Sequence, residues 1–221
     1  MVPKWKKWLS YLWEWHIESR PSATNPHLYV SLRKGEYQLC TDKAIYSWGT
    51  RYDNFVKAFR TVEFDQLPGR EALVLGFGLG SVPIILERQL HQTFHYTGVE
   101  IDEAVIYLAS KYTLPDLQSP VQLICADAGT YVATTSQSFD LIAMDVFLSD
   151  QVPVAFNQLS FLQRLHDLLT PGGILFFNRL SLSIDDQKKA RTYFDHTFRA
   201  VFPNGQLLDA DGNYVLIGTR F

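Results

Sequence analysis

The order of apolar and polar segments in this 221-residue chain predicts an α/β domain built around a mostly parallel sheet. From Glu71 onward, short apolar runs alternate with segments of helical periodicity, which is the pattern of a parallel sheet covered on both faces. A glycine-rich turn follows the first of these runs. The chain ends in a hairpin, whereas a symmetric dinucleotide-binding fold would continue with further strand–helix units.

Residues 1–60 are predicted to form a separate N-terminal unit that contains an aromatic-rich helix and a small antiparallel β unit. Four of the five tryptophans lie in residues 1–17, where helical spacing predicts one aromatic stripe made of Trp5, Trp8, Leu9, Leu12 and Trp13. The polar segment 20–26 contains two prolines and is predicted to be a linker. Strands are expected at 28–32, 36–40 and 43–47, and a helix at 52–60.

The aromatic stripe has two interpretations. It docks on the body of the protein or on a second subunit, or it lies in a membrane surface, since Lys4, Lys6 and Lys7 flank it. The basic cluster is small, which favours docking. Exposed aromatic side chains also favour self-association, so we expect a homo-oligomer.

Residues 61–221 are predicted to form the main domain. Its strands are expected at 72–76, 95–100, 121–125, 141–145, 174–178, 206–208 and 214–219. Its helices are expected at 81–89, 103–111, 130–134, 157–169 and 184–198. Proline and glycine at positions 171–173 are expected to end the fourth helix and form a turn.

Composition and charge exclude several classes of function. Apolar residues make up 47% of the chain and charged residues 19%, so a sizeable core is available and global disorder is excluded. The net charge of −3 argues against a nucleic-acid partner, because binding to phosphates requires a basic surplus. Neither the 6 histidines nor Cys40 and Cys125 have metal-ligand spacing, so no metal site is expected. No apolar run reaches the roughly 18 residues of a membrane span and no signal peptide is recognised, so we expect a cytoplasmic protein.

The segment Val74 to Ser81 is the strongest functional signal in the sequence. A buried strand runs through Gly76, Gly78 and Gly80 into a helix. Glycines at such a turn let the backbone approach a ligand closely, and the helix N-terminus offers free N–H groups. Glu100 ends the next strand, where a carboxylate can accept hydrogen bonds from both ribose hydroxyls. Together these residues predict a nucleoside-binding crevice.

A dinucleotide-binding fingerprint would place glycine or alanine at residue 81, which is a serine here. With glycines at 76, 78 and 80, the segment 71–221 resembles the class I S-adenosylmethionine-dependent methyltransferases. This resemblance implies a Rossmann-like fold with a mostly parallel seven-stranded sheet that ends in an antiparallel hairpin. It also implies S-adenosylmethionine as the donor. The acceptor is expected to be a small molecule, because a chain of this length leaves little room for a separate substrate domain.

The same resemblance implies roles for individual residues. Glu100 matches the acid that binds the ribose, and Ile101 matches the residue beside the adenine. Asp127 and Ala128 match the acid and small residue at the adenine edge, with Asp127 accepting from the exocyclic amine. Asp145 matches a residue near the methionine moiety and the reacting group, where it is expected to act as a base or to orient the acceptor. Capping of the loop that follows is an equally weighted alternative for Asp145.

Nearly the whole chain after residue 27 resembles the spermidine synthase-like proteins more closely. The resemblance rests on residues 28–59, with Gly35, Gln38 and Tyr46-Ser47-Trp48-Gly49, and on residues 145–153, which lead into Phe161-Leu162 and then Leu169-Thr170-Pro171-Gly172-Gly173. If the N-terminal strands fold over the crevice, the side chains that line its acceptor side are expected to be Gln38, Tyr46, Trp48 and Asp150.

Two acids of the true aminopropyltransferases are replaced here. Their glycine motif reads Gly-Gly-Gly-Asp-Gly and their catalytic loop reads Asp-Ser-Ser-Asp, and Leu79 and Leu148 stand at one acid of each motif. A diamine is cationic at pH 7 and its site needs carboxylates, so the two leucines favour methyl transfer to a small acceptor. Two alternatives stay open. One is aminopropyl transfer from decarboxylated S-adenosylmethionine to a different amine, and the other is a non-catalytic nucleoside-binding or interaction protein.

Overall fold

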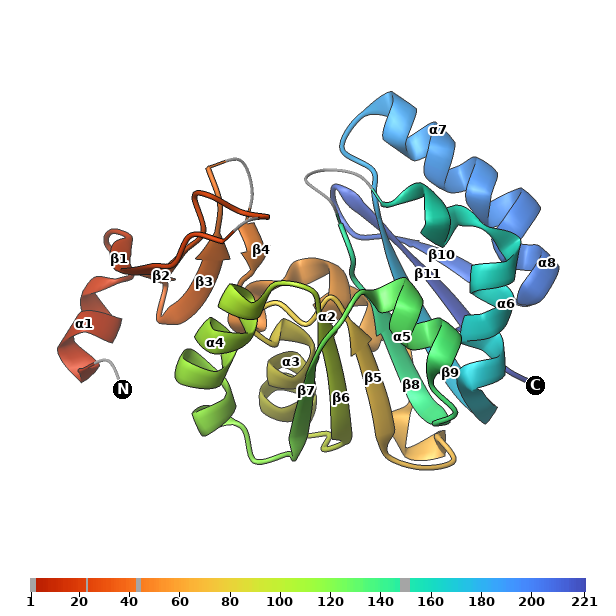
Figure 1. Cartoon of the computed structure of the whole chain (residues 1–221), viewed down its shortest axis with the longest axis horizontal. Helices are drawn as coiled ribbons and strands as arrows, with labels where there is room; N and C mark the ends of the chain where they lie inside the picture. The colour runs from red at the N-terminus through yellow and green to blue at the C-terminus, as the bar shows by residue number, and fades with distance from the viewer. Residues whose placement is uncertain (1–2, 23, 43–44, 148–151) are drawn as a thin grey trace.

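The computed structural model describes residues 3–22, 24–42, 45–147 and 152–221. A short helix, α1 (Lys4–Leu9), comes first in the chain (Figure 1). It is followed by an antiparallel sheet of four strands in sequence order: β1 (Trp15–Ser19), β2 (Tyr29–Arg33), β3 (Glu36–Cys40) and β4 (Ile45–Ser47). This N-terminal sheet confirms the predicted antiparallel unit and adds one strand to it.

The main sheet has seven strands in the order β10-β11-β9-β8-β5-β6-β7. Their bounds are β5 (Glu71–Leu75), β6 (His95–Glu100), β7 (Val121–Cys125), β8 (Phe139–Met144), β9 (Leu169–Leu180), β10 (Gln206–Asp209) and β11 (Asn213–Thr219). Strands β5 to β9 pair in parallel, and β11 runs antiparallel to both of its neighbours, β9 and β10. The predicted mostly parallel sheet with a terminal antiparallel hairpin is therefore confirmed.

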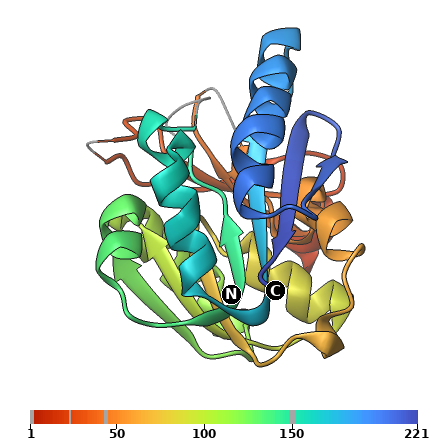
Figure 2. The ribbon, with the colours of Figure 1, turned by 90° about the vertical axis from the view of Figure 1, so that its right-hand side faces the viewer.

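Helices cover both faces of the main sheet (Figures 1 and 2). Side chains alternate along each strand, so Ala72 and Val74 of β5 face one helical layer while Leu73 and Leu75 face the other. The first layer contains α2 (Asp53–Phe59), α3 (Ser81–Leu90) and α4 (Glu103–Tyr112). The second contains α5 (Ala128–Thr134), α6 (Leu159–Leu168) and α7 (Ile184–Tyr193), which continues through residues 194–198 into α8 (Arg199–Val201). None of the helices in the described ranges is long and apolar enough to cross a bilayer.

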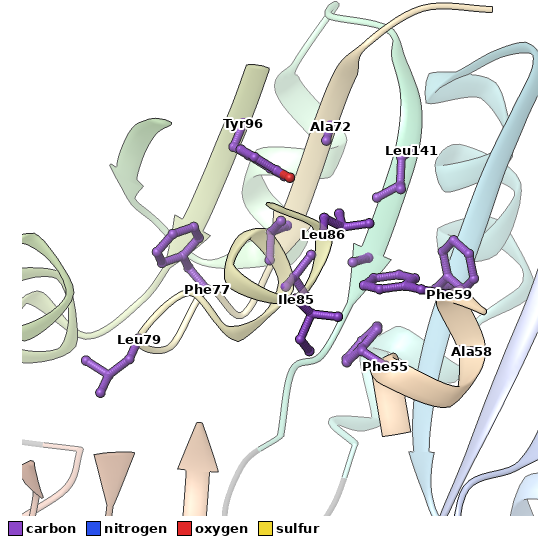
Figure 3. Close-up of a cluster of buried hydrophobic side chains, with 14 of the residues drawn as sticks. Phe55, Ala58, Phe59, Ala72, Phe77, Leu79, Ile85, Leu86, Tyr96 and Leu141 are labelled. Carbon is purple, nitrogen blue, oxygen red and sulfur yellow. The ribbon is translucent and has the colours of Figure 1, made fainter. Parts of the chain in front are cut away.

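One apolar cluster joins the N-terminal sheet to the main domain. Figure 3 shows Phe55 and Phe59 of α2 beside Ile85 of α3, and these side chains are fully buried. Leu28 and Leu39 from the N-terminal sheet belong to the same cluster. The two sheets therefore share buried apolar surface, which is the main source of folding free energy.

The N-terminal segment differs from its prediction. Helix α1 ends at Leu9, so that Leu12 and Trp13 lie beyond it, and residues 15–19 form β1 instead of continuing the helix. The reason is tertiary: β1 pairs with β2, and this pairing overrides the helical spacing of the apolar residues. The stripe was predicted to dock on the body or on a second subunit. Docking on the body is wrong, because Trp8 is 70% exposed and Leu12 66% exposed, and docking on a second subunit stays a prediction.

Strand β9 is longer than predicted. Residues 171–173 were expected to form a turn, but they lie inside β9, which spans Leu169–Leu180. The backbone N–H of Gly172 donates to the carbonyl of Arg220 over 2.7 Å, and the N–H of Arg220 donates to Gly173 over 2.9 Å. Pairing with the last residues of the chain thus extends the strand through a segment whose composition favours a turn.

Replacing Phe59 with alanine tests the shared core. The Phe59 ring is fully buried and lies 4.8 Å from the ring of Phe176 on β9 and 5.4 Å from that of Phe55, measured between centroids. We expect Phe59→Ala to lower the free energy of unfolding by about 3–5 kcal/mol, measured by urea denaturation. The control Phe221→Ala removes a ring that is 85% exposed and should change the free energy of unfolding by less than about 0.5 kcal/mol. Equal effects of the two substitutions would contradict the assignment of Phe59 to the shared core.

Candidate functional site

The main sheet reverses its strand order between β5 and β8. From β5 the chain proceeds to β6 and β7 on one side, while β8 and β9 lie on the other. In open α/β sheets ligands bind at the carboxyl ends of the strands at such a switch point. The residues that follow β5 and β8 there are Gly76 and Asp145, so two predicted site residues lie at the expected place.

Gly76 and Asp145 are in direct contact through the backbone. Gly76 has a φ of +79°, and a Cβ atom at this position would overlap the carbonyl group of Asp145. The N–H of Asp145 donates to the carbonyl of Leu75 over 2.8 Å, which brings the end of β8 against the glycine turn. Only glycine combines this φ with this approach. The backbone of the glycine turn and that of Asp145, the predicted catalytic residue, therefore fix each other's position.

The glycine turn lies against the N-terminal sheet. A Cβ atom on Gly78 would lie 3.3 Å from the Cβ atom of Ser47, which ends β4. The hydroxyls of Ser47 and Ser81 are hydrogen-bonded over 2.7 Å, and the backbone N–H of Trp48 donates to Oγ of Ser81 over 3.1 Å. Because Ser81 is the first residue of α3, these bonds fasten β4 over the start of that helix. The expected folding of the N-terminal strands over the glycine turn is observed.

The carboxylate of Glu100 is oriented by three backbone N–H groups. Its Oε2 accepts from Gly78 over 3.1 Å, and its Oε1 accepts from Ile101 over 2.9 Å and from Asp102 over 3.2 Å. Burial raises the pKa of Glu100, and these three donors oppose that effect by stabilising the ionised form. The arrangement presents an oriented acceptor beside the glycine turn, which is what binding of two vicinal hydroxyls requires.

The residues expected at the adenine edge lie on adjacent strand ends. Ile101 is 52% exposed, and the N–H of Ala126 donates to the carbonyl of Glu100 over 3.0 Å, which holds the end of β7 beside that of β6. Asp127 is exposed and caps α5, since its Oδ1 accepts from the N–H of Thr130 over 2.8 Å. Ala128, the first residue of α5, is buried. The strand ends thus place an apolar side chain and a carboxylate on the same edge.

Asp145 is held by two side-chain donors that the sequence analysis did not identify. Nδ2 of Asn178, at the end of β9, donates to Oδ1 of Asp145 over 2.8 Å, and the hydroxyl of Tyr52 also donates to this carboxylate. The pKa of Asp145 is raised to about 6, because burial and the nearby charge of Glu100 raise it by more than the hydrogen bonds from Asn178 and Tyr52 lower it. A carboxyl group with this pKa can accept a proton near neutral pH.

The carboxylate of Asp102 connects the segment before β2 to the edge of the main sheet where the nucleoside is expected to bind. One oxygen, Oδ1, caps α4 by accepting from Ala104 over 2.9 Å. The other, Oδ2, accepts from the hydroxyls of Ser22 and Thr24 and from the amide of Asn25. Burial alone would raise the pKa of Asp102, but these donors hold it below its usual value. Ser22, Thr24 and Asn25, from the segment 20–26 that was predicted to be a linker, are therefore hydrogen-bonded to the main domain beside Glu100.

The four expected acceptor residues do not form one cluster. The Tyr46 hydroxyl donates to Asn25 over 3.3 Å, and burial, with smaller contributions from nearby carboxylates that include Glu100, raises its pKa. Gln38 is fully buried inside the N-terminal sheet, where its Oε1 accepts from Ser31 over 3.2 Å. The Trp48 indole N–H donates to the carbonyl of Arg33 over 3.4 Å, so the ring faces the β2–β3 turn. Asp150 lies outside the described residues.

The geometry fits a nucleoside with a cationic group. At the glycine turn only backbone atoms fit. The carboxylate of Glu100 supplies two oxygen atoms that its backbone donors hold in a fixed orientation. Oδ1 of Asn178 is buried beside Asp145 and lacks a hydrogen-bond partner among the described residues, so that an ammonium group would satisfy it. In the ranges that the structure describes, no three His, Cys, Asp or Glu side chains are close enough to hold a metal ion.

Removal of the Tyr52 hydroxyl tests whether this donor affects the pKa of Asp145. Tyr52→Phe deletes a hydroxyl that stabilises the carboxylate, so the pKa of Asp145 should rise further above about 6. The measurement is a titration followed by carbon NMR of the labelled aspartate carboxyl groups. Tyr131→Phe is a matched control, since its hydroxyl contacts Gln137 and not Asp145. An unchanged or lowered pKa in Tyr52→Phe would show that the hydroxyl does not act on Asp145.

Comparison with known proteins places these features in context. A family model described as a methyltransferase domain matches residues 73–177. A probable polyamine aminopropyl transferase of Bifidobacterium longum is 29% identical over 140 residues, which cover 63% of this chain and 30% of that protein. A polyamine aminopropyltransferase of Vibrio vulnificus is 29% identical over 191 residues, which cover 82% of this chain and 59% of that protein. The chain thus spans from about a third to three fifths of these two relatives.

Two solved structures share the fold. A probable spermidine synthase from Corynebacterium glutamicum superimposes with a TM-score of 0.68 at 20% identity, covering 92% of this chain and 76% of that one. Human methyltransferase-like protein 13 in complex with SAH gives a TM-score of 0.58 at 22% identity, covering 76% of this chain and 82% of that one. The superposition with the C. glutamicum protein extends over both sheets. The chain therefore has a spermidine synthase-like class I S-adenosylmethionine-dependent methyltransferase fold.

Proposed function

We propose that the chain is a transferase that binds S-adenosylmethionine in the crevice above Gly76, Glu100 and Asp127 and transfers its methyl group to a small acceptor. The observation that carries this proposal is the position of Asp145. Its carboxyl group has a pKa of about 6, is held by two donors and lies against the glycine turn at the topological switch point. Such a carboxyl group suits proton transfer at a ligand-binding edge.

The donor would be held by contacts that follow the strand ends. Glu100 would accept from the ribose hydroxyls, Ile101 would cover one face of the adenine, and Asp127 would accept from its exocyclic amine. Asn178 would accept from the ammonium group through its unpaired Oδ1. Each of these residues lies at the carboxyl end of a neighbouring strand or just after it, which supports one ligand spanning all of them.

The chemistry needs alignment and one proton acceptor. When bound, the donor supplies a sulfonium group that makes its methyl carbon electrophilic. The acceptor's nucleophilic atom would form a bond to that carbon as the carbon–sulfur bond breaks and the sulfonium becomes a neutral thioether. Asp145 would take the proton that the nucleophile loses, while Tyr52 and Asn178 hold its carboxylate in position.

Leu79 favours methyl transfer over aminopropyl transfer. It occupies the position of an acid in the aminopropyltransferase glycine motif, and here its side chain is 1% exposed and packed in the apolar cluster between the two sheets (Figure 3). A buried leucine offers no charge to a diamine, which would have to enter the site as a cation. Leu148, at the second such position, lies outside the described residues.

Aminopropyl transfer from decarboxylated S-adenosylmethionine is the second candidate. It is favoured by the names of the two bacterial relatives, and a proton acceptor such as Asp145 would also serve an attacking amine. It requires an acceptor whose binding does not depend on the two missing carboxylates. A non-catalytic binding protein is the third candidate, and the two tests that follow separate all three.

Calorimetric titration with the two donors tests the binding proposal. We expect S-adenosylmethionine to bind more tightly than its decarboxylated form, because methyl transfer uses the intact donor. Glu100→Gln should weaken binding about tenfold, since hydrogen bonds to an ionised acceptor contribute about 1.5–3 kcal/mol. Glu63→Gln, which changes an exposed acid in the segment after α2, is the control and should bind normally. Preference for the decarboxylated donor would support aminopropyl transfer, and binding of neither would exclude a donor-dependent enzyme.

The pH dependence of transfer tests the role of Asp145. Below a pH of about 6 this carboxyl group is protonated and cannot accept a proton, so kcat/KM should fall as the pH drops through that value and level off above it. Asp145→Asn should lower kcat by about 100-fold or more with donor affinity retained, and its residual rate should not follow that pH profile. Product formation from isotope-labelled donor gives both readings. Full activity of the variant would remove Asp145 from the mechanism.

A further inference from the structure

The N-terminal end of the molecule exposes a group of large apolar side chains that the proposed function does not use. We call this group the aromatic platform: Trp5, Trp8, Tyr11, Leu12 and Trp13. The exposed fractions of these five side chains run from 53% to 70%. They belong to α1 and the turn after it, and these segments lie at the end of the molecule farthest from the C-terminus (Figure 1). An exposed cluster of this kind marks an interaction surface.

The aromatic platform is held on the N-terminal sheet. Ser10 is 1% exposed; its carbonyl accepts from the N–H of Lys34 over 2.7 Å, and its Oγ accepts from the N–H of Gly35 over 2.8 Å. The ring of Trp15 on β1 lies 6.2 Å from that of Trp5 and 6.0 Å from that of Trp13, measured between centroids. These contacts fasten the segment to the β2–β3 turn while its large side chains stay exposed to solvent.

Basic groups surround the aromatic platform. Lys4, Lys6 and Lys7 lie on α1, and Arg33 and Lys34 lie at the β2–β3 turn to which Ser10 is bonded. The nearest acid in the sequence is Glu14; Glu18 is paired with Lys111, and Glu36 faces Arg88. The asymmetry extends to the whole chain. Residues 1–51 contain eight basic and four acidic residues, whereas residues 52–221 contain twelve and nineteen.

We propose that the aromatic platform docks the protein peripherally on an anionic phospholipid surface. Tryptophan and tyrosine side chains partition to the level of the lipid headgroups, where the ring is buried and its polar atom stays hydrated. Lys4, Lys6 and Lys7 on α1, with Arg33 and Lys34 at the turn bonded to Ser10, supply positive charge that attracts acidic lipids, whereas the acidic surplus lies in residues 52–221. An end of the molecule that combines exposed aromatic side chains with basic residues fits a bilayer surface, without a membrane span.

Charge distinguishes this partner from a second copy of the chain. In a symmetric dimer the same patch faces itself, so that Lys4, Lys6 and Lys7 would oppose the same lysines of the partner subunit. The cores of protein–protein interfaces are also depleted in lysine. A lipid surface carries the opposite charge and imposes no such repulsion. Self-association through the platform is therefore the competing outcome that the experiment has to separate.

Co-sedimentation of the full chain with vesicles tests the proposal. Phosphatidylcholine vesicles with phosphatidylserine should bind the protein, and vesicles of phosphatidylcholine alone should bind it much more weakly. Binding should decrease as salt is added, since exposed charges are screened. Lys4→Ala with Lys7→Ala should weaken binding on the order of thirtyfold, because each lysine near an anionic surface contributes about fivefold. The charge-matched control is Lys188→Ala with Arg199→Ala, two exposed residues of the C-terminal region.

A second pair of variants tests the contribution of the apolar side chains to vesicle binding. Trp8→Ala with Trp13→Ala should reduce binding to the acidic vesicles and leave the melting temperature nearly unchanged, because both rings are exposed. The control Ile184→Ala with Phe221→Ala removes two side chains that are 86% and 85% exposed elsewhere on the molecule, and it should bind normally. Absence of binding by the unmodified chain, or binding unaffected by loss of the two tryptophans, would overturn the proposal. A dimer in solution that only the tryptophan variant abolishes, without lipid binding, would assign the platform to a second copy instead.

Discussion

The approach of Gly76 to the Asp145 carbonyl is the constraint on which the rest of the site depends. It joins the ends of β5 and β8 at the switch point, where a side chain of any size at residue 76 would push the two loops apart. The same turn donates from Gly76 to the carbonyl of Val99 over 2.9 Å, which adds the end of β6. Three strand ends are thereby fixed relative to one another. The distance between Asp145 and Glu100, whose charge raises the pKa of Asp145, is set by this backbone arrangement.

The N-terminal sheet completes the site from the other side. It is fastened over the glycine turn by the buried pair Ser47–Ser81, and at the nucleoside edge by the donors that surround Asp102. Both attachments are polar and lie at the borders of a shared apolar cluster. Burial supplies the stability of the contact between the sheets, while the hydrogen bonds determine its register. The N-terminal sheet is thus part of the binding geometry as well as of the core.

The fold could be predicted from the sequence because its signals are local. Alternating strands and helices, the glycine turn and the terminal hairpin each depend on residues that are close in the chain. Within the site, Gly76, Glu100 and Asp145 were recognisable because each is the last residue of a predicted strand. Tyr52 was not, since its spacing matches that of an apolar helix face and its hydrogen bond to Asp145 spans ninety-three positions. Asn178 carried a weak signal as a polar residue at a strand end. Strand β1 and the hydrogen bonds to Asp102 depend on contacts between segments that are distant in the sequence. No local sequence pattern predicts such contacts.

The position of the last strand has a consequence for how the chain acquires its structure. Strand β11 ends at Thr219, yet it lies inside the sheet, between β9 and β10, and contacts α2 near the other end of the sequence. During synthesis the sheet therefore stays incomplete until residues 206–219 have left the ribosome, and until then β9 exposes an unpaired edge. Formation of the native state is a late, long-range event, and folding should be slow relative to that of helical proteins of similar length.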